Sequence, residues 1–544
     1  MEPRSFARRA AAALLLVSAA PAQIGNVSGG VLIPEEACYD VLHYDLALTV
    51  DPAQKTIEGT LAMRAKVVAP CPVFVLDLDS ALTVRAVRLD GGAVPFDREP
   101  GRVRVRPEAK LAEGSTFTVE VAYGGAPQVA KNPPWSGGFT WAETADKRPW
   151  IATTCQQEGA DLWWPCKDHP SDKPDTMDLH ITVPKGLVDA SNGTLRGREE
   201  HGDQVTWHWH IASPISNYCV ALDIAPYVEL DSTFTCIDGT VMPIQFFVLP
   251  EHEEHARRCM PQFLDHLHVF EQILGPYPFR AEKYGIAETP HLGMEHQTMI
   301  AYGNGFRDEQ YDWLHNHELS HEWWGNLVTC RDWKDMWIHE GFGTYMQALY
   351  RERRFGRKFY DEEVRRYRTV DRAAIAPRDS KTTFEIYFGG GGSNDIYHKG
   401  ALVLHTLRWQ MGDEKFFAAL HRFCYPTKAA EKATDGSQVR LVDTDDFVRL
   451  CSEIAGEDLA WFFEVYVRQP ALPRLHSEKV GGVLKLRWET PEGLAFRLPV
   501  PVVLRGALQR VPMPDGSGEL EVGDGDFVVD PDQLVLMRAL PRGQ

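Results

Sequence analysis

The chain has 544 residues, and its hydrophobic content of 44% and charged content of 24% are those of a globular protein with two to four domains. A formal net charge of −19 argues against nucleic acid and anionic lipid as partners, since both are negatively charged. The ten cysteines could pair in an exported protein, but they are spread too widely for a small disulfide scaffold.

Residues 1–22 are predicted to be a signal peptide. Arg4, Arg8 and Arg9 precede an apolar run over residues 10–20, and Ala20-Pro21-Ala22 provides a small-x-small cleavage site. The run is too short to span a bilayer, and no later stretch reaches the roughly 18 apolar residues of a span. We therefore expect export to a periplasm or out of the cell, with no membrane span in the mature chain. An apolar N-terminal helix of the fold is the alternative.

An antiparallel β domain is predicted over residues 36–228. Apolar and polar residues alternate there, as in strands with one buried face. The clearest runs are Tyr44, Leu46, Leu48 and Val50, and later Val205, Trp207 and Trp209. Two segments, 154–159 and 163–168, are aromatic and polar without alternation, which indicates either a functional loop or an ordinary tight corner.

Helical periodicity follows, and alternation returns at the end of the chain. A helix is predicted around Phe263, Leu267, Phe270 and Leu274, with Pro261 in its first turn. Glycines 389–392 lack the strand, Lys and Ser/Thr of a phosphate-binding loop and predict a mobile loop. Residues 471–544 alternate with period two, which predicts a third, small β domain.

The strongest chemical signal is His317-Glu318-Leu319-Ser320-His321. On a helix, side chains four residues apart lie on one face, so both imidazoles can point at one metal ion with Glu318 beside it. Eighteen residues separate His321 from Glu340, enough to finish one helix and return on a second. A catalytic zinc ion can be held by two His and one carboxylate, with the fourth coordination position left open for water.

Two alternatives agree less well with the sequence: a metal site with other ligands, and a surface helix of ordinary polar residues without a metal. His315 lies two residues from His317, on the far side of the helix, and His339 points about 100° away from its neighbour Glu340. A metzincin would need a third His at the position of Leu327.

The sequence resembles the M1 family of zinc aminopeptidases, a gluzincin group, from Tyr39 to about residue 470. The motifs that carry the resemblance occur in order along the chain: Tyr44, Pro165-Cys166, Gly275-Pro276-Tyr277-Pro278-Phe279, Met294-Glu295, His317–Asn326, Trp337–Phe342 and Tyr397-x-Lys399-Gly400. The resemblance implies a peptide hydrolase with one zinc ion per chain, held by His317, His321 and Glu340.

The resemblance also implies roles for the remaining site residues. Glu318 would be the general base that takes a proton from the attacking water, and Tyr397 would stabilise the oxyanion. Glu295 would bind the free α-ammonium of a peptide, with Gln156 sharing this task. Gly293 and Met294, next to Glu295, would line the same substrate site.

Several positions depart from the family pattern. Leu292 and His296 replace the usual Gly and Asn around Met294-Glu295, and Gln156 stands where many members have Glu. Thr154 replaces a common Gln, and Asp161 replaces an Arg. These changes affect the expected substrate preference rather than the reaction.

We expect a multidomain α+β fold. A thermolysin-like α/β catalytic domain (229–470) would follow the N-terminal β domain, with a C-terminal β sandwich after it and the active site between the first two domains. The expected substrates are peptides with a free N-terminus. The alternatives are an endopeptidase, a non-enzymatic binding module, and an epoxide hydrolase, whose extra Tyr and Asp would fall in the glycine run, at Gly389 and Gly392.

Overall fold

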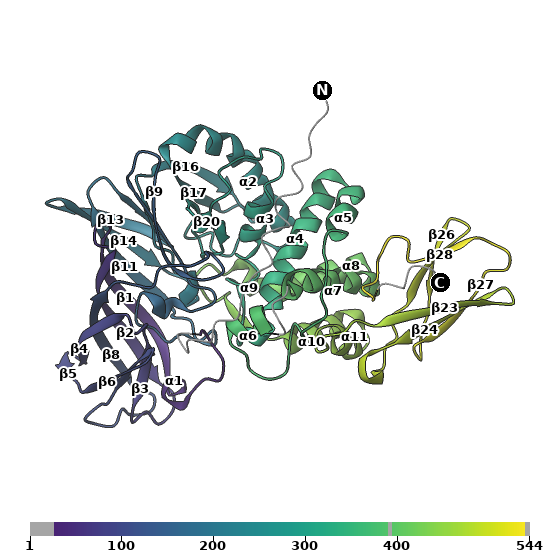
Figure 1. Ribbon diagram of the computed structural model, residues 1–544, viewed down its shortest axis with the longest axis horizontal. Coiled ribbons are helices and arrows are strands. Elements are labelled where there is room, and N and C mark those ends of the chain that lie inside the picture. The colour runs from purple at the N-terminus through teal and green to yellow at the C-terminus, as the bar shows by residue number, and fades with distance from the viewer. Residues whose placement is uncertain (1–26, 390–393, 539–544) are drawn as a thin grey trace.

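The computed structural model describes residues 27–389 and 394–538. The predicted signal peptide (1–22) and residues 390–392 of the glycine run lie outside the described residues. In chain order, a β-rich part, a mixed part rich in helices and a small β part follow one another along the long axis of the molecule (Figure 1). The predicted multidomain α+β fold class is confirmed.

The first part is built on an eight-stranded sheet with the order β13-β14-β11-β1-β2-β8-β4-β5. All neighbours are antiparallel except β1 and β11, which pair in parallel, so the expectation of an antiparallel domain is wrong for this pair. Smaller sheets β12-β15-β10-β9 and β3-β7-β6 complete it. The elements are α1 (Pro34–Ala37), β1 (Tyr39–Asp51), β2 (Thr56–Val67), β3 (Phe74–Asp77), β4 (Leu82–Leu89), β5 (Gly92–Ala93), β6 (Phe96–Glu99), β7 (Arg102–Val105), β8 (Thr116–Gly125), β9 (Gly138–Glu143), β10 (Pro149–Thr154), β11 (Thr176–Pro184), β12 (Val188–Ala190), β13 (Thr194–His201), β14 (Gln204–Ile211) and β15 (Asp223–Ala225).

The second part starts with the sheet β16-β17-β18-β20-β19 and continues as packed helices. Figure 1 shows α2, α3 and α4 beside this sheet, and α7 next to α4. The elements are β16 (Val228–Thr235), β17 (Val241–Val248), α2 (Glu253–Leu274), β18 (Tyr284–Glu288), β19 (Gly293–Met294), β20 (Ile300–Tyr302), α3 (Trp313–Ser320), β21 (Val328–Cys330), α4 (Trp337–Phe355), α5 (Arg357–Val364), α6 (Thr383–Phe388), α7 (Asp395–Met411), α8 (Asp413–Cys424), α9 (Lys428–Lys432), β22 (Arg440–Val442), α10 (Thr444–Ala455) and α11 (Ala460–Tyr466).

Helix α2 begins earlier than the sequence predicts. Pro261 lies inside the helix rather than in its first turn, because eight polar-rich residues from Glu253 onward already form helix before it. Pro261 is exposed, so the carbonyl that loses its helical hydrogen-bond donor lies on the solvent side, where water can replace the donor. The predicted apolar face, with Phe263, Leu267 and Phe270, is buried.

The third part consists of two three-stranded sheets, β23-β24-β27 and β26-β25-β28. Leu484, Leu486 and Trp488 of β24 are buried, as their alternation predicts. The strands are β23 (Arg474–Val480), β24 (Val483–Glu489), β25 (Val500–Leu504), β26 (Ala507–Val511), β27 (Ser517–Glu521) and β28 (Phe527–Val529).

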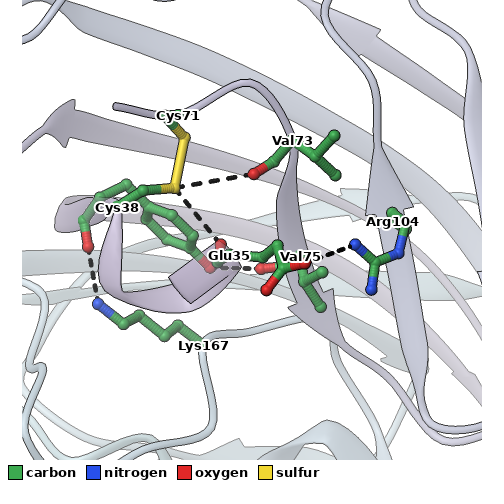
Figure 2. Close-up of a disulfide and its surroundings, with 8 residues drawn as sticks. Glu35, Cys38, Cys71, Val73, Val75, Arg104 and Lys167 are labelled. Carbon is green, nitrogen blue, oxygen red and sulfur yellow. Dashed lines mark hydrogen bonds and ion pairs between the residues drawn. A yellow bond between two sulfur atoms is a disulfide. The ribbon is translucent and has the colours of Figure 1, made fainter. Parts of the chain in front are cut away.

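One disulfide, Cys38–Cys71, ties the start of β1 to the segment before β3 (Figure 2). Next to it the Tyr39 hydroxyl donates to the Val75 carbonyl (2.6 Å), and Lys167 Nζ donates to the Tyr39 carbonyl (2.7 Å). The other eight cysteines, all within the described residues, are buried and free. In the described part of the chain, no helix has both the length and the apolar character needed to cross a membrane.

Candidate metal and peptide-binding site

Helix α3 contains His317 and is followed directly by His321, and the start of the helix is fixed by a buried cap. The Asp312 carboxylate accepts a hydrogen bond from the His315 backbone N–H (3.0 Å), which satisfies one of the free donors at a helix N-terminus. The Tyr302 hydroxyl, from β20, donates to the other oxygen of Asp312 (2.5 Å). The sheet therefore sets where the helix begins and how it is oriented.

Two glycines let helices α3, α4 and α7 approach closely. A Cβ on Gly343 would lie only 3.1 Å from Cε1 of His321, and a Cβ on Gly341 would lie 2.8 Å from the Cα of Gly400. Side chains at these positions would push α3 and α7 away from α4. The close contacts bring His321 to α4 and place Tyr397, in the first turn of α7, near the same site.

The three predicted metal ligands converge on one point. Nε2 of His317 and Nε2 of His321 are 3.2 Å apart, and they lie 3.4 and 3.5 Å from Oε2 of Glu340. A tetrahedral zinc ion with bonds of about 2.0–2.1 Å needs ligand atoms roughly 3.3 Å apart. The three donor atoms of this protein therefore have the spacing that a zinc ion requires.

Hydrogen bonds from outside the triangle aim these donors. The backbone oxygen of Trp324 lies 2.8 Å from Nδ1 of His321, which leaves Nε2 as the ligand atom. Oε1 of Glu340 accepts from the Tyr387 hydroxyl (2.7 Å) and from Gln156 Nε2 (2.9 Å). The buried Oε2 of Glu340 has no hydrogen-bond partner among the described residues. An unsatisfied carboxylate oxygen facing two imidazoles fits a cation, and the N/O ligand set fits zinc.

The two other nearby histidines belong to the core. The ring of His315 stacks on Phe263 at 3.8 Å and hydrogen bonds to the Tyr284 hydroxyl. Nε2 of His339 accepts from the Cys330 backbone N–H (3.0 Å). Neither is among the described groups of residues whose donors could hold a metal.

Glu318 is buried beside the metal ligands. Its carboxylate, that of Glu295 and the ring of His321 offer ligand atoms within 4.8 Å of one another. Burial, followed by the charges of Glu295 and Glu340, raises the pKa of Glu318 well above its ordinary value. Gly293 makes room for it, since a Cβ there would lie 2.5 Å from Oε1 of Glu318.

Glu295 is held by donors from two different parts of the chain. Gln156 Nε2 and the Tyr218 hydroxyl (3.0 Å) both donate to its Oε1, and Asn326 Nδ2 donates to its backbone oxygen (3.1 Å). Met294, which precedes it in β19, is buried. The predicted substrate residues Gln156, Met294 and Glu295 are therefore brought together next to the candidate metal site.

Tyr397 is half-buried in the first turn of α7. Its ring centre lies 6.1 Å from that of His317 and 6.2 Å from that of Tyr387. Burial and the negative charge of Glu340 raise the pKa of Tyr397, so its hydroxyl keeps its proton at neutral pH. Of the two positions considered for an epoxide hydrolase, Gly389 directly follows α6 and Gly392 lies outside the described residues.

Two residues of this site, Tyr218 and Tyr387, were not predicted from the sequence. Tyr218 lies in a short 3-10 helix of the β-rich part, and Tyr387 lies in the six-residue helix α6. Neither belongs to a recognisable motif or a long periodic segment. The charges of Glu295 and Glu340 could have suggested that each carboxylate needs hydrogen-bond donors. Spacing along the chain, however, does not identify which residues donate.

Most of the departures from the family pattern lie in buried surroundings. Asp161 is buried, and burial together with the nearby carboxylate of Asp168 raises its pKa well above the ordinary value. Thr154 ends β10 and is also fully buried. His296 is fully buried as well, and burial lowers its pKa to about 3, so its ring is neutral.

Two family models match the chain. The model described as Peptidase M1 N-terminal domain matches residues 41–219, and the model described as Peptidase family M1 domain matches residues 307–466. Among solved structures, an M1 zinc metallopeptidase from Deinococcus radiodurans superposes with a TM-score of 0.65 at 25% identity, covering 80% of this chain and 94% of that one. A mutant of that enzyme bound to a Tyr-Ser-Ala substrate gives a TM-score of 0.66 at 24% identity, covering 80% of this chain and 95% of that one.

Curated relatives are named aminopeptidases. Aminopeptidase N of Lactococcus lactis is 22% identical over 82% of this chain and 52% of its own length, and leucine aminopeptidase 2 of Aspergillus oryzae is 29% identical over 60% and 52%. This chain thus spans about half the length of the curated relatives it matches. The two matching family models together cover more than half of the chain, and the convergent ligands lie inside the second one, so we conclude that the chain belongs to peptidase family M1.

Proposed function

We propose that this protein is a zinc-dependent aminopeptidase that releases the N-terminal residue from peptides. The observation that carries the proposal is the position of Glu295, whose carboxylate lies in one close group with Glu318 and His321. A site for a cationic amine therefore adjoins the metal ligands and the candidate base. Pairing the ammonium of a peptide with Glu295 would bring its first peptide bond to the metal and no later one.

The chain's own groups can carry the proton transfers of the reaction. A zinc ion, when bound by His317, His321 and Glu340, polarises a carbonyl and makes water a stronger nucleophile at neutral pH. Glu318, buried beside these ligands, would accept the proton of the attacking water and pass it to the leaving amine. Tyr397, which stays protonated, would donate a hydrogen bond to the oxygen on which charge develops.

Gln156 has a particular part in binding the substrate amine. Its Nε2 donates to both Glu295 and Glu340, so its Oε1 is the amide atom left to accept from an ammonium group. A neutral amide adds less attraction than a second carboxylate would. We therefore expect Glu295 to supply most of the charge pairing.

A panel of aminoacyl-coumarin amides, each compared with its N-acetylated counterpart, tests the proposal. The enzyme would be assayed as purified, with a chelator, and after zinc is restored. Zinc-dependent cleavage of the free-amine forms alone is the expected result. In the variant Glu295→Gln, which removes the charge and keeps the shape, we expect kcat/KM on free-amine substrates to fall by at least tenfold.

Two other results would each indicate a different function. Equal cleavage of acetylated and free substrates would identify an endopeptidase and remove the role of Glu295. Zinc binding without any cleavage would favour a binding module.

We also propose that the protein is exported. Cys38–Cys71 supports this, because stable disulfides form in oxidising compartments. N-terminal sequencing of the protein from a secreting host should start after Ala22, and an intact Met1 would contradict export by cleavage of this segment.

A further inference from the structure

A cluster of four histidines and two aspartates lies on the outer face of the N-terminal sheet, on strands β1, β11 and β14. The cluster, here called the His/Asp patch, consists of His43, Asp45, Asp178, His180, His208 and His210. Their neighbours along the strands, such as Leu179 and Trp209, are buried, while the patch residues are partly exposed. The patch is thus on the solvent side of the sheet and takes no part in the proposed reaction.

Strand register brings the patch together. His180 on β11 is paired with His208 on β14, and the next outward pair is Asp178 with His210. On the other side of β11, Asp178 is paired with Asp45 of β1. Directly opposed residues on one face of an antiparallel pair have Cβ atoms about 4.5–5.5 Å apart, so the side chains of His180 and His208 are direct neighbours.

The centre of the patch is the pair His180 and His208. Their Nδ1 atoms are 2.6 Å apart, so one of the two must carry a proton and the other must accept it. Oδ1 of Asp45 lies 3.3 Å from Nε2 of His180. A carboxylate at Nε2 keeps the proton there and leaves Nδ1 of His180 with its lone pair directed at His208, which is how metal-binding histidines are oriented.

His210 is oriented in the same way. Oδ1 of Asp178 lies 2.7 Å from Nδ1 of His210 and Oδ2 lies 3.5 Å from Nε2 of His43. With its proton held on Nδ1 by the carboxylate, His210 presents Nε2 as the lone-pair nitrogen. His208 and His210 are two apart on β14, so both rings project from the same face of the sheet.

We propose that the His/Asp patch binds one divalent transition-metal ion, through Nδ1 of His180, Nδ1 of His208 and Nε2 of His210. Imidazole nitrogens select ions such as Zn²⁺ or Cu²⁺ over Mg²⁺ and Ca²⁺. The proton on Nδ1 of His208 moves to Nε2 of the same ring, so that both Nδ1 atoms offer lone pairs to the ion. The two rings move apart by less than about 1 Å to ligand spacing. Water completes its coordination.

The patch should bind zinc more weakly than the site formed by His317, His321 and Glu340. The only groups of three donors already within ligand distance, in the part of the chain that the structure describes, are those around His321. In the patch His210 must rotate to reach the ion, and that ordering lowers affinity. Metal binding at the patch does not depend on the peptidase activity, because none of the patch residues contacts the residues of the candidate metal and peptide-binding site.

Metal content at controlled free zinc tests the proposal. After equilibrium dialysis of the full-length protein at about 10 μM free Zn²⁺, a concentration suited to a micromolar site, the wild type should hold two zinc ions per chain. The double variant His180→Asn/His208→Asn should hold one and keep wild-type peptidase activity. His201→Asn, on the exposed end of β13, is the matched control and should still hold two.

A conservative variant separates ligation from folding. Asp45→Asn removes no ligand but loosens the orientation of His180, so affinity of the second ion should fall about 10- to 100-fold. A wild type with one zinc ion at saturation, or a double variant that still holds two, would overturn the proposal. So would anomalous scattering from zinc-soaked crystals that placed the second ion away from β11 and β14.

Discussion

At the residue scale, the two oxygens of the Glu340 carboxylate have separate partners. Oε1 accepts hydrogen bonds from Tyr387 and Gln156, and Oε2 faces the imidazoles of His317 and His321. Burial acts to raise the pKa of Glu340, but the neighbouring imidazoles of His317 and His321 lower it to about 2. The group is therefore ionised and cannot rotate without losing two donors, which suits a metal ligand.

Tyr387→Phe should weaken zinc binding about 10- to 100-fold, as expected when a donor to a ligating carboxylate is lost. Competition with a chelator of known affinity measures the effect. Tyr367→Phe is the matched control, since it removes a buried hydroxyl that donates to the Thr344 backbone oxygen of the same helix, α4. Equal affinities of wild type and Tyr387→Phe would show that Gln156 alone orients Glu340.

Glu318→Gln should keep zinc but lower kcat at least about 100-fold, because the amide cannot accept the proton of water. Zinc content by mass spectrometry and turnover of a free-amine substrate would be measured on the same sample. Near-normal turnover with zinc bound would exclude Glu318 as the base.

The element scale shows which parts of the fold are predictable. Helices α3 and α4 can be predicted from the spacing of His317, His321 and Glu340, because residues that bind one metal ion must point at it from fixed positions along the chain. The alternation in β1 and β14 predicts strands, but the parallel pairing of His43 with Thr176 joins distant segments and leaves no local trace. For the same reason Tyr387, on a short helix without a motif, was missed.

Strand β12 links the small four-stranded sheet to the large one through a buried carboxyl group. Trp209 Nε1, on β14, donates to Oδ2 of Asp189 (2.9 Å), and Oδ1 of Asp189 has no partner among the described residues. Burial raises the pKa of Asp189 to about 8, against the lowering effect of Trp209, Ser191 and Lys283. The folded protein therefore holds this proton at pH values where the unfolded chain has lost it.

This carboxyl group should make stability fall as pH rises. Its contribution is complete below about pH 4, the unfolded pKa, and declines by up to about 1.4 kcal/mol per pH unit until the folded pKa of about 8. Asp189→Asn, which can still accept from Trp209, should show a smaller loss of unfolding midpoint between pH 5 and pH 8 than the wild type. The exposed Asp203→Asn serves as control, and a pH slope unchanged in Asp189→Asn would contradict the prediction.

At the scale of the whole molecule, the proposed site joins the two larger parts of the chain. Gln156 and Tyr218 come from the β-rich part, whereas the carboxylates that they bind belong to Glu295, directly after β19, and to Glu340 of α4. Further polar contacts run between these parts: Lys173 Nζ donates to the Asn326 backbone oxygen (2.8 Å), and Lys283 Nζ to that of Ser191 (2.7 Å). A metal ion at Glu340 would therefore stabilise the interface as well as the helices that supply its ligands.

Removing zinc should lower the stability of the molecule, because three buried carboxylates, Glu295, Glu318 and Glu340, would lose their common counter-charge. At free zinc about 1,000 times its dissociation constant, binding stabilises the folded state by about 4 kcal/mol, which corresponds to several degrees in unfolding midpoint. Calorimetry of zinc-depleted and zinc-restored protein measures this shift. The His180→Asn/His208→Asn background removes any contribution of the His/Asp patch. In that background, Glu340→Ala should abolish the dependence on zinc, and a zinc-induced shift that survives it would place the stabilising ion outside the cleft.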